Sequence, residues 1–415
     1  MIIENLNQNL KLDYIQIICQ EPRNSINIRI LMLIFIASGG TGGHIMPAKA
    51  TAEEFIKNRY EVTVLGDKKC LAFFSDKKIF NCYKIQSSKV GKTIFDLLSF
   101  SIKIGFGTIK SLLLIFLKRP KYVFCFGGYA TFPVALASVI ARKKLILHEQ
   151  NAHLGKVNRI FAKYAYKIAL SFSTTTGLDK KYQHKIVITG NPVRKDIAKL
   201  SKEDYKLPID DLMPNIKNRL GYKVLLHSDF SNLRNIKKEP FIITVIGGSG
   251  GAKIFSDILP KSFFNLSKDI KENLFIFQQC RKDLAKKTFK SYKSYNISVT
   301  IDHFFHDMAS LIAVSHLVIA RSGSSTIFEV SAAKKPMILV PFAQSADDHQ
   351  LKNATFFQKN NAALVIEEKD FNISNVSRVI SQLVTDKKKL HSLSKNIFEL
   401  SNIAASQKLC ELIKN

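Results

Sequence analysis

Apolar residues along the chain gather in short runs, and each run is followed by a longer stretch in which apolar positions recur every three or four residues. Short apolar runs that alternate with helical periodicity are typical of a parallel sheet covered by helices on both faces. The first half is therefore predicted to be a Rossmann-like domain. Its expected strands are Leu31–Ala37, Val62–Leu65, Tyr122–Phe126, Lys144–His148 and Ile186–Thr189.

The same pattern restarts at Phe241 and predicts a second domain of the same kind. Its expected strands are Phe241–Ile246, Leu274–Gln278, Leu317–Ala320, Met337–Val340 and Ala363–Ile366. We thus predict an α/β fold with two Rossmann-like parallel-sheet domains that face a central cleft beyond the carboxyl ends of their strands.

Five segments make up the predicted organisation. Residues 1–28 form an extension, 29–195 the first domain and 240–398 the second, while a final amphipathic helix over 399–415 is assigned to the first domain. The polar, weakly periodic residues 196–239 are interpreted as a linker enlarged by an insertion, because connections between elements rarely exceed about 12–15 residues. The run that precedes the first glycine loop is interpreted as a strand, not as a signal peptide.

Each domain opens with a glycine-rich loop directly after a strand, GGTGGH at 39–44 and GGSGGAK at 247–253. Such loops let backbone N–H groups approach a ligand, and the helix that follows favours anions. Neither loop fits the G-x-G-x-x-G or the Walker pattern, which argues against a dinucleotide dehydrogenase or an ATPase. His44 stands where the helix begins, and its spacing leaves open a general base, a hydrogen-bond donor to substrate or a plain polar residue.

A third motif, RSGSSTIFE at 321–329, places small hydroxylated residues at the start of a helix, which suits a diphosphate. Glu329 lies about one turn into that helix, where a carboxylate can accept both hydroxyls of a ribose. The polar loop 341–353 carries Gln350, which can bond sugar hydroxyls. Arg194 follows the turn after the last strand of the first half and can clamp a phosphate or pair with a carboxylate.

The net charge of +29 partly reflects the abundance of lysine throughout the chain. It also suits attraction to anionic lipid or to phosphorylated substrates, whereas no nucleic-acid recognition motif is found. Six cysteines stand singly without a C-x-x-C pair, which argues against a zinc site or a disulfide framework and fits a reducing cytoplasm.

No segment contains the roughly 18 apolar residues that span a bilayer. Residues 94–119 are rich in aromatic and aliphatic side chains and are fringed by lysines. They suit a surface that dips into an anionic leaflet, although the segment by itself favours a pair of ordinary helices that dock on the sheet.

Taken in order, seven motifs resemble the MurG family of bacterial cell-wall glycosyltransferases. They are GGTGGHIMPA (39–48), FGGYATFPVALAS (126–138), HEQNAHLGKVNR (148–159), TGNPVR (189–194), GGSGGAK (247–253), RSGSSTIFEVSAAKKPMILVPF (321–342) and DDHQLKNA (347–354). The resemblance implies a GT-B fold and transfer of N-acetylglucosamine from UDP-GlcNAc to lipid I, undecaprenyl-diphosphoryl-muramyl-pentapeptide, with inversion. It implies no cofactor and no tightly bound metal. It further implies peripheral association with an anionic membrane surface at the cytoplasmic face of the inner membrane, and other cell-wall enzymes as partners.

The resemblance also implies roles for individual residues. His44 would be the catalytic residue near the acceptor hydroxyl, and Gly250 departs from the glutamine that the family usually has in its second loop. A related transferase with another lipid acceptor, an epimerase of the same fold and a catalytically impaired scaffold remain as alternatives. The implied substrate-binding residues are Thr41, Gly42 and Gly43 for diphosphate or acceptor, Asn151, Arg194 and Ser249 for the donor, Phe305 for uracil, Ser324, Ser325, Thr326 and Glu329 for phosphate and ribose, and Gln350 for the sugar.

Overall fold

The computed structural model describes residues 32–74, 76, 79–88, 93–201, 227–229, 240–248, 251–305 and 307–414. The predicted extension 1–28, Ser249, Gly250 and most of the predicted linker lie outside the described residues. Both sheets belong to one compact unit, Leu33–Asn415.

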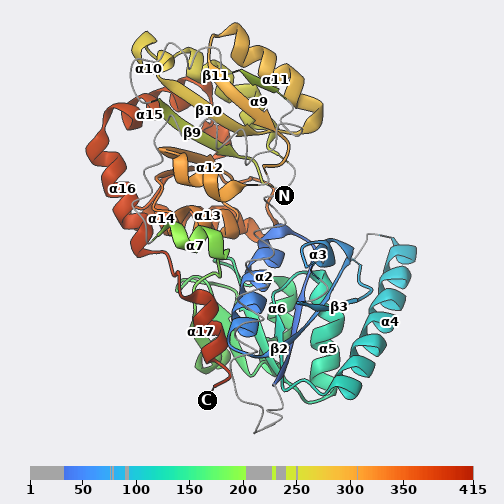
Figure 1. The fold of residues 1–415 in the computed structure, drawn as a ribbon. Coiled ribbons are helices and arrows are strands. Elements are labelled where there is room, and N and C mark those ends of the chain that lie inside the picture. Colours follow the sequence, from blue (N-terminus) through green and yellow to red (C-terminus); the bar gives the residue numbers. More distant parts are fainter. Residues whose placement is uncertain are drawn as a thin grey trace, which may run out of the picture. The chain divides into compact units, whose positions relative to one another are not determined.

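Seven parallel strands form the first sheet, in the order β3-β2-β1-β4-β5-β6-β7 (Figure 1). The central strands are almost wholly buried, as expected for a sheet covered on both faces. All five predicted strands are present, whereas two short ones, β3 and β6, were not predicted. The strands are β1 (Leu33–Ser38), β2 (Glu61–Gly66), β3 (Asn81–Lys84), β4 (Tyr122–Cys125), β5 (Lys144–Glu149), β6 (Lys167–Leu170) and β7 (Ile186–Ile188).

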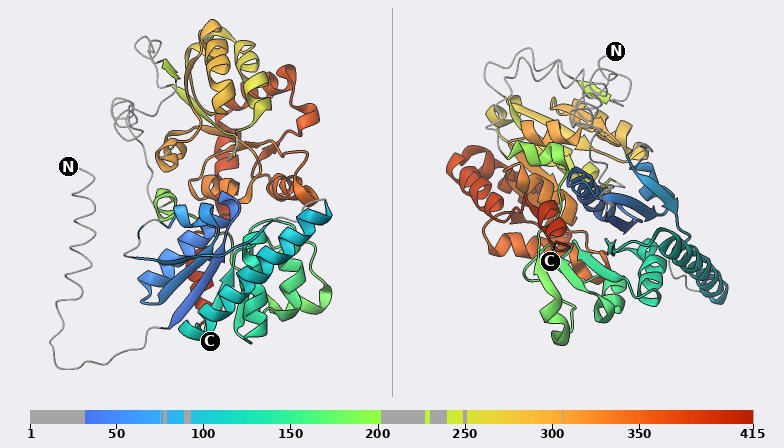
Figure 2. Two further views of the ribbon diagram at one scale, coloured as in Figure 1. Left: turned by 90° about the vertical axis from the view of Figure 1, so that its right-hand side faces the viewer. Right: turned by 60° about the horizontal axis from the view of Figure 1, so that its bottom comes forward.

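Segment 94–119 forms one continuous helix of 25 residues, α4, and not the pair of helices considered above. A capping box fixes its start, since the Thr93 hydroxyl accepts from the Asp96 amide and the Asp96 carboxylate accepts from the Thr93 amide. It packs on α5 and lies at the outer edge of the first half (Figure 2). The helices of this half are α2 (Gly42–Lys57), α3 (Lys68–Ala72), α4 (Ile94–Lys118), α5 (Phe132–Ile140), α6 (Lys156–Phe161) and α7 (Lys195–Leu200).

The second sheet also has seven strands, in the order β14-β13-β12-β9-β10-β11-β8. All pairs are parallel except that β8 runs antiparallel to β11. The edge strand β8 is formed by three residues of the segment interpreted as a linker, and neither β8 nor β11 was predicted. The strands are β8 (His227–Asp229), β9 (Phe241–Ile246), β10 (Leu274–Gln279), β11 (Ser298–Asp302), β12 (Leu317–Ala320), β13 (Met337–Leu339) and β14 (Leu364–Val365).

The helix predicted over 399–415 is wrong at its start. Helix α16 ends at Glu399, where the Ser401 hydroxyl and amide both donate to the Phe398 carbonyl, and α17 begins only at Ala405. Helix α16 packs on α13 of the second half, whereas α17 packs on α2 of the first (Figure 1). The helices of the second half are α9 (Lys253–Phe264), α10 (Lys268–Glu272), α11 (Lys282–Ser294), α12 (Met308–Val314), α13 (Ser324–Ala332), α14 (His349–Lys359), α15 (Ile373–Thr385) and α16 (Lys387–Glu399), and α17 (Ala405–Glu411) joins the first half.

One hydrophobic core is shared between the halves. Phe172, which follows β6, is fully buried, and its ring lies 5.1 Å from the rings of Phe328 and Phe356 in the second half. Ile197 of α7 is buried in the same cluster, although it falls at the edge of the segment interpreted as a polar linker. Apolar packing thus joins the two sheets beside the loops that follow their strands.

Candidate active site

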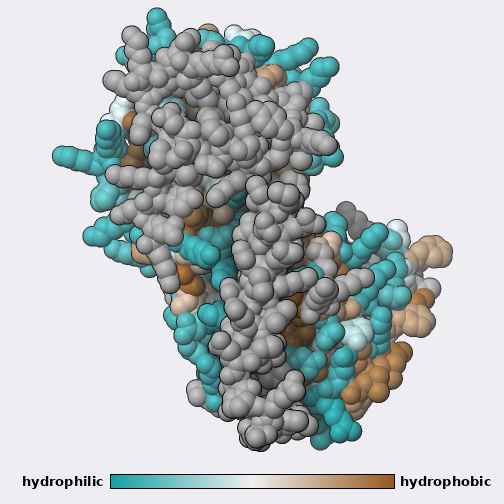
Figure 3. Space-filling view, in the orientation of Figure 1, coloured by the Kyte–Doolittle hydropathy of each residue, from teal (hydrophilic) through white to brown (hydrophobic). Residues whose placement is uncertain are grey.

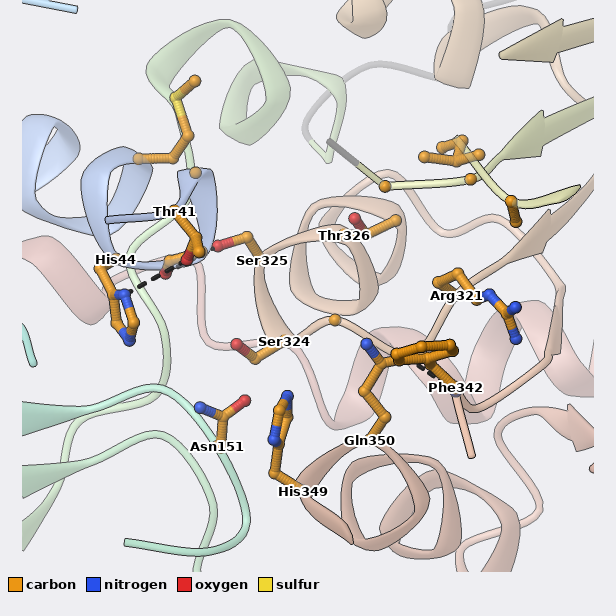
Figure 4. A pocket seen from close by; sticks show the side chains of 18 of the residues that line it. Thr41, His44, Asn151, Arg321, Ser324, Ser325, Thr326, Phe342, His349 and Gln350 are labelled. Atoms are coloured by element: carbon orange, nitrogen blue, oxygen red, sulfur yellow. Dashed lines mark hydrogen bonds between the residues drawn. The ribbon is translucent and has the colours of Figure 1, made fainter. Parts of the chain in front are cut away.

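A cavity of about 1430 Å³ lies between the loops that follow the carboxyl ends of the strands in both halves (Figure 4). This is where ligands bind in open parallel sheets. The second glycine loop reaches it through Gly247, Gly248 and Gly251, while Ser249 lies outside the described residues. Every other predicted site residue lines this one cavity: Thr41, Gly42, Gly43, His44, Asn151, Arg194, Phe305, Ser324, Ser325, Thr326, Glu329 and Gln350.

The first glycine loop holds His44 in the opening turn of α2, which begins at Gly42. Asp67 fixes the loop, because its carboxylate accepts a hydrogen bond from the Gly40 amide at 2.8 Å. The His44 Nδ1 atom lies 3.2 Å from the Thr41 hydroxyl, and Figure 4 shows this contact. Burial lowers the pKa of His44 to about 4. The imidazole is therefore neutral at physiological pH and able to accept a proton.

Two glycines after β4 make room for the His44 ring. Gly127 and Gly128 both have positive φ angles, 77° and 79°, which side chains rarely tolerate. A Cβ atom on Gly128 would lie 3.2 Å from His44 Nδ1 and 3.0 Å from the Gly39 carbonyl oxygen. This turn therefore packs closely against both the His44 imidazole and the first glycine loop.

A buried carboxylate, Glu149 at the end of β5, organises the adjacent loop. It accepts hydrogen bonds from the Asn151 amide and side chain, from the Gly155 amide and from Asn158 Nδ2. Burial nevertheless raises the pKa of Glu149, since desolvation disfavours its charged form. Sequence reasoning selected Asn151 but missed Glu149 and Asn158, although both lie within the same motif.

His148 is structural and lies out of the cavity. Its ring is fully buried, with Nδ1 3.0 Å from Gln150 Nε2 and Nε2 3.3 Å from the Gly190 carbonyl oxygen. These contacts require Nδ1 to accept and Nε2 to donate. Burial lowers the pKa of His148 to about 4, and a second ring proton would face the Gln150 N–H group.

Two predicted donor-binding residues pair with each other across the halves. Arg194, which precedes α7, donates to Glu329 of α13 through Nε at 2.7 Å and through its terminal NH2 group at 3.1 Å. This bidentate geometry is the strong form of the arginine–carboxylate interaction. Glu329 is 9% exposed, so it is not the solvated carboxylate that a helix surface usually carries.

The start of α13 gathers hydrogen-bond donors for an anion. Gly323 precedes the helix, and Ser324, Ser325 and Thr326 form its first turn (Figure 4). The Ser325 hydroxyl donates to the Gly43 carbonyl at 3.2 Å, so this turn also contacts the first glycine loop. Free amides, hydroxyl groups and the helix dipole together can neutralise a diphosphate. Among the described residues, no three His, Cys, Asp or Glu side chains are grouped as metal ligands.

An arginine at the cavity wall stacks on two aromatic rings, which was not predicted from the sequence. The Arg321 guanidinium lies 5.3 Å from the ring centres of both Phe255 and Phe342, and it bonds the Glu368 carboxylate. The predicted sugar ligand Gln350 accepts from the Phe342 amide at 3.0 Å. Arg321 opens a motif recognised in the sequence, but its partner Glu368 carries no local signal.

The comparisons by sequence agree on one class of enzyme. Residues 34–170 match the glycosyltransferase family 28 N-terminal domain, and residues 242–409 match the glycosyltransferase family 28 C-terminal domain. A UDP-N-acetylglucosamine–N-acetylmuramyl-(pentapeptide) pyrophosphoryl-undecaprenol N-acetylglucosamine transferase of Rickettsia bellii is 33% identical over 88% of this chain and 94% of its own length.

Two solved structures share the fold. MurG of Acinetobacter baumannii superimposes with a TM-score of 0.68 at 23% identity, covering 92% of this chain and 99% of its own. A UDP-N-acetylglucosamine 2-epimerase gives a TM-score of 0.60 at 13% identity, covering 92% of this chain and 95% of its own. Because the fold accommodates both a transferase and an epimerase, the substrate assignment depends on the sequence relatives and on the site.

Proposed function

Since this chain belongs to the MurG family of glycosyltransferases, we propose that it transfers N-acetylglucosamine from UDP-GlcNAc to the muramyl C4 hydroxyl of lipid I. The product is lipid II, the precursor of peptidoglycan. The observation that carries the proposal is the single cavity in which both glycine loops meet the first turn of α13 and the Arg194–Glu329 pair. The predicted fold, two parallel-sheet domains in the GT-B arrangement, is confirmed.

The leaving group of this reaction is UDP, whose diphosphate gains negative charge as the glycosidic bond breaks. The amides and hydroxyls of Ser324, Ser325 and Thr326 would stabilise that charge at the start of α13. Glu329 would accept the ribose hydroxyls, and Gln350 would contact the sugar. The backbone at Phe305, a buried residue at the cavity wall, would meet the uracil.

His44 would act on the acceptor. Inversion requires the muramyl hydroxyl to attack the anomeric carbon from the face opposite UDP, and it loses a proton in doing so. A neutral imidazole at the cavity wall can take this proton. The Thr41 hydroxyl beside Nδ1 would help to fix the ring.

A transfer assay tests the proposal. Purified protein is expected to move radiolabelled N-acetylglucosamine from UDP to a short-chain lipid I analogue. Glu329→Ala is expected to lower kcat/KM at least about 100-fold, because it removes the proposed ribose ligand and leaves Arg194 without its partner. Donor binding without transfer would instead favour a catalytically impaired scaffold, and transfer only to diacylglycerol would refute the assignment of lipid I.

We also infer peripheral membrane association through α4. Within this helix, Ser99–Lys118 is long and apolar enough to cross a membrane by length and composition, which the sequence count above did not find. However, Ile104, Ser111 and Ile115 are buried against the first domain, so the helix is part of the fold. Its exposed face combines apolar side chains with Lys103 and Lys110. The exposed apolar residues are Phe95, Ile102, Phe106, Ile109, Leu113, Phe116 and Leu117.

Apolar side chains gather at the edge of the molecule where Figure 1 places α4 (Figure 3). An apolar face flanked by lysines suits an anionic bilayer surface, where each basic residue contributes about 1 kcal/mol. A lipid-linked acceptor requires such proximity. Co-sedimentation with vesicles that does not depend on anionic lipid would contradict this inference.

A further inference from the structure

Asn353 of α14 has a fully buried side chain that bonds to both halves of the protein. Its Oδ1 accepts from the Ala152 amide at 2.8 Å, and its Nδ2 donates to Asn151 Oδ1 at 3.1 Å and to the Ser322 carbonyl at 3.0 Å. All three contacts join residues that border the proposed donor site. We propose that Asn353 is a positioning residue that fixes which way the Asn151 amide faces the nucleotide sugar; this inference rests on the proposed function.

The orientation of Asn151 follows from the hydrogen-bond capacity of its two neighbours. Asn353 offers only N–H groups on the side facing Asn151, because its oxygen bonds Ala152. Glu149 offers only an oxygen, Oε1, which accepts from Asn151 Nδ2 at 3.2 Å. If the Asn151 amide turned over, N–H would face N–H at one end and oxygen would face oxygen at the other. The two neighbours therefore permit one orientation.

Glu149, at the end of this row of hydrogen bonds, is itself held in place. The second oxygen of Glu149 accepts from the Gly155 amide and from Asn158 Nδ2, both at 2.8 Å. Asn158 in turn bonds the His148 carbonyl at 3.1 Å. The row of contacts from Asn353 through Asn151 to Glu149 thus begins in the second half and ends on strand β5 of the first.

The fixed orientation decides what Asn151 presents to a ligand. Its Nδ2 carries two hydrogens, and Glu149 takes one of them. Asn151 lines the cavity and is drawn there in Figure 4. The remaining N–H group suits an acceptor oxygen of the nucleotide sugar, either the acetamido carbonyl or a diphosphate oxygen.

Asn353 also reaches the other donor motif. Its bond to the Ser322 carbonyl holds the turn that leads into the first turn of α13. One side chain therefore sets the position of Asn151 relative to the hydroxyl groups that would meet the diphosphate. Such placement should affect the affinity for the nucleotide-sugar substrate and should leave the affinity for the lipid substrate unchanged.

The test is the near-isosteric variant Asn353→Asp, which keeps the acceptor for Ala152 and removes both N–H donors. We expect the donor KM to rise at least about tenfold while the KM for the lipid I analogue changes less than about twofold. Ser377→Ala is the matched control, because Ser377 is a buried residue whose hydroxyl bonds Ser262 outside the cavity. A donor KM equal to that of wild type in Asn353→Asp would overturn the inference.

A second substitution separates positioning from a merely structural role. In Asn353→Asp the Asn151 amide can turn over, and Glu149→Gln then supplies the N–H that its oxygen needs. The double variant should recover part of the lost Tm, since the Asn151 backbone amide also bonds Glu149 Oε1 and loses that acceptor, yet its donor KM should stay raised because Asn151 now faces the ligand reversed. Recovery of the donor KM together with Tm would overturn the inference. If Asn353→Asp alone does not fold, the double variant is compared directly with wild type.

Calorimetric titration with UDP, UDP-glucose and UDP-GlcNAc identifies the contacted oxygen. Equal weakening of all three in Asn353→Asp points to the diphosphate, whereas weakening confined to UDP-GlcNAc points to the acetamido group. Unchanged affinity for all three overturns the inference. Because titration needs no acceptor, the proposed transfer is judged separately by the activity of the wild-type protein.

Discussion

At the scale of single residues, desolvation determines the chemistry of His44. The ring is held between the Thr41 hydroxyl and the turn at Gly127 and Gly128. Its charged form loses more by burial than it gains from neighbouring acceptors, which is why its pKa falls to about 4. A histidine in water is partly protonated near pH 6.5, whereas this one keeps its lone pair at every physiological pH.

Replacing this imidazole tests its proposed role as base. His44→Gln should lower kcat at least about 100-fold, as expected when a general base is lost, and should change the donor KM little. The control is His184→Gln, at an exposed histidine that does not line the cavity. Equal kcat values for His44→Gln and wild type would assign the proton transfer to another group.

The pH profile of the wild-type enzyme follows from the same shift. Because the pKa of His44 in the folded protein is lowered to about 4, the base is already unprotonated at pH 6. Activity should therefore remain constant as pH falls to about 5 and decline only as it approaches 4. A decline centred near 6.5 would indicate an exposed histidine instead. Circular dichroism at each pH separates this effect from unfolding.

At the scale of elements, α4 has two apolar faces with different tasks. One face packs on α5, where Gly107 allows the close approach of Pro133. The other carries side chains such as Phe106 and Leu113, which are 63% and 57% exposed. A contiguous apolar surface of this kind marks an interaction site more often than ordinary protein surface.

Polar substitution on the outer face should weaken membrane binding without unfolding the domain. The double change Phe106→Ser and Leu113→Ser should reduce co-sedimentation with anionic vesicles at least about tenfold, since each buried apolar side chain contributes about 1.5–3 kcal/mol. Transfer to a water-soluble acceptor analogue should be unaffected. Phe264→Ser, at an exposed aromatic residue of the second half, is the control. Unchanged vesicle binding of the double variant would refute the role of α4.

At the scale of the whole molecule, buried apolar packing and the bidentate Arg194–Glu329 pair join the two halves, whereas exposed charge contributes little. The ion pair between Arg159 and Asp347 crosses between the halves, but both side chains are 36% exposed, and such pairs contribute about 0–1 kcal/mol. Phe172, by contrast, is fully buried among aromatic residues of the second half.

Removing that ring should uncouple the halves. Phe172→Ala is expected to lower the free energy of unfolding by about 3–5 kcal/mol, and calorimetry should show two separated transitions. Phe263→Ala removes a fully buried ring within the second half alone. It should cost a similar free energy but leave the halves coupled, so that a single transition is seen at a lower temperature. Identical melting behaviour of the two variants would contradict the role of Phe172 in coupling.

Features that depend on local backbone chemistry could be predicted from the sequence alone. Apolar runs predicted the central strands, since residues buried on both faces of a sheet are mostly apolar. The glycine loops and the serine-rich turn were recognisable because positive φ angles and helix starts restrict residue choice. The site residues implied by the family resemblance, so far as the structure describes them, all line one cavity. Their individual roles stay predictions.

Contacts between side chains that are far apart in the sequence could be identified from the folded structure but not from the sequence. Asn353 and Asn151 are 202 residues apart, as Arg194 and Glu329 are 135 apart, and no local pattern pairs them. The short strands β3 and β8 owe their existence to a neighbouring strand, because three or four residues carry too weak a pattern alone. The low pKa of His44 likewise arises from burial, which only the packing of the folded chain creates.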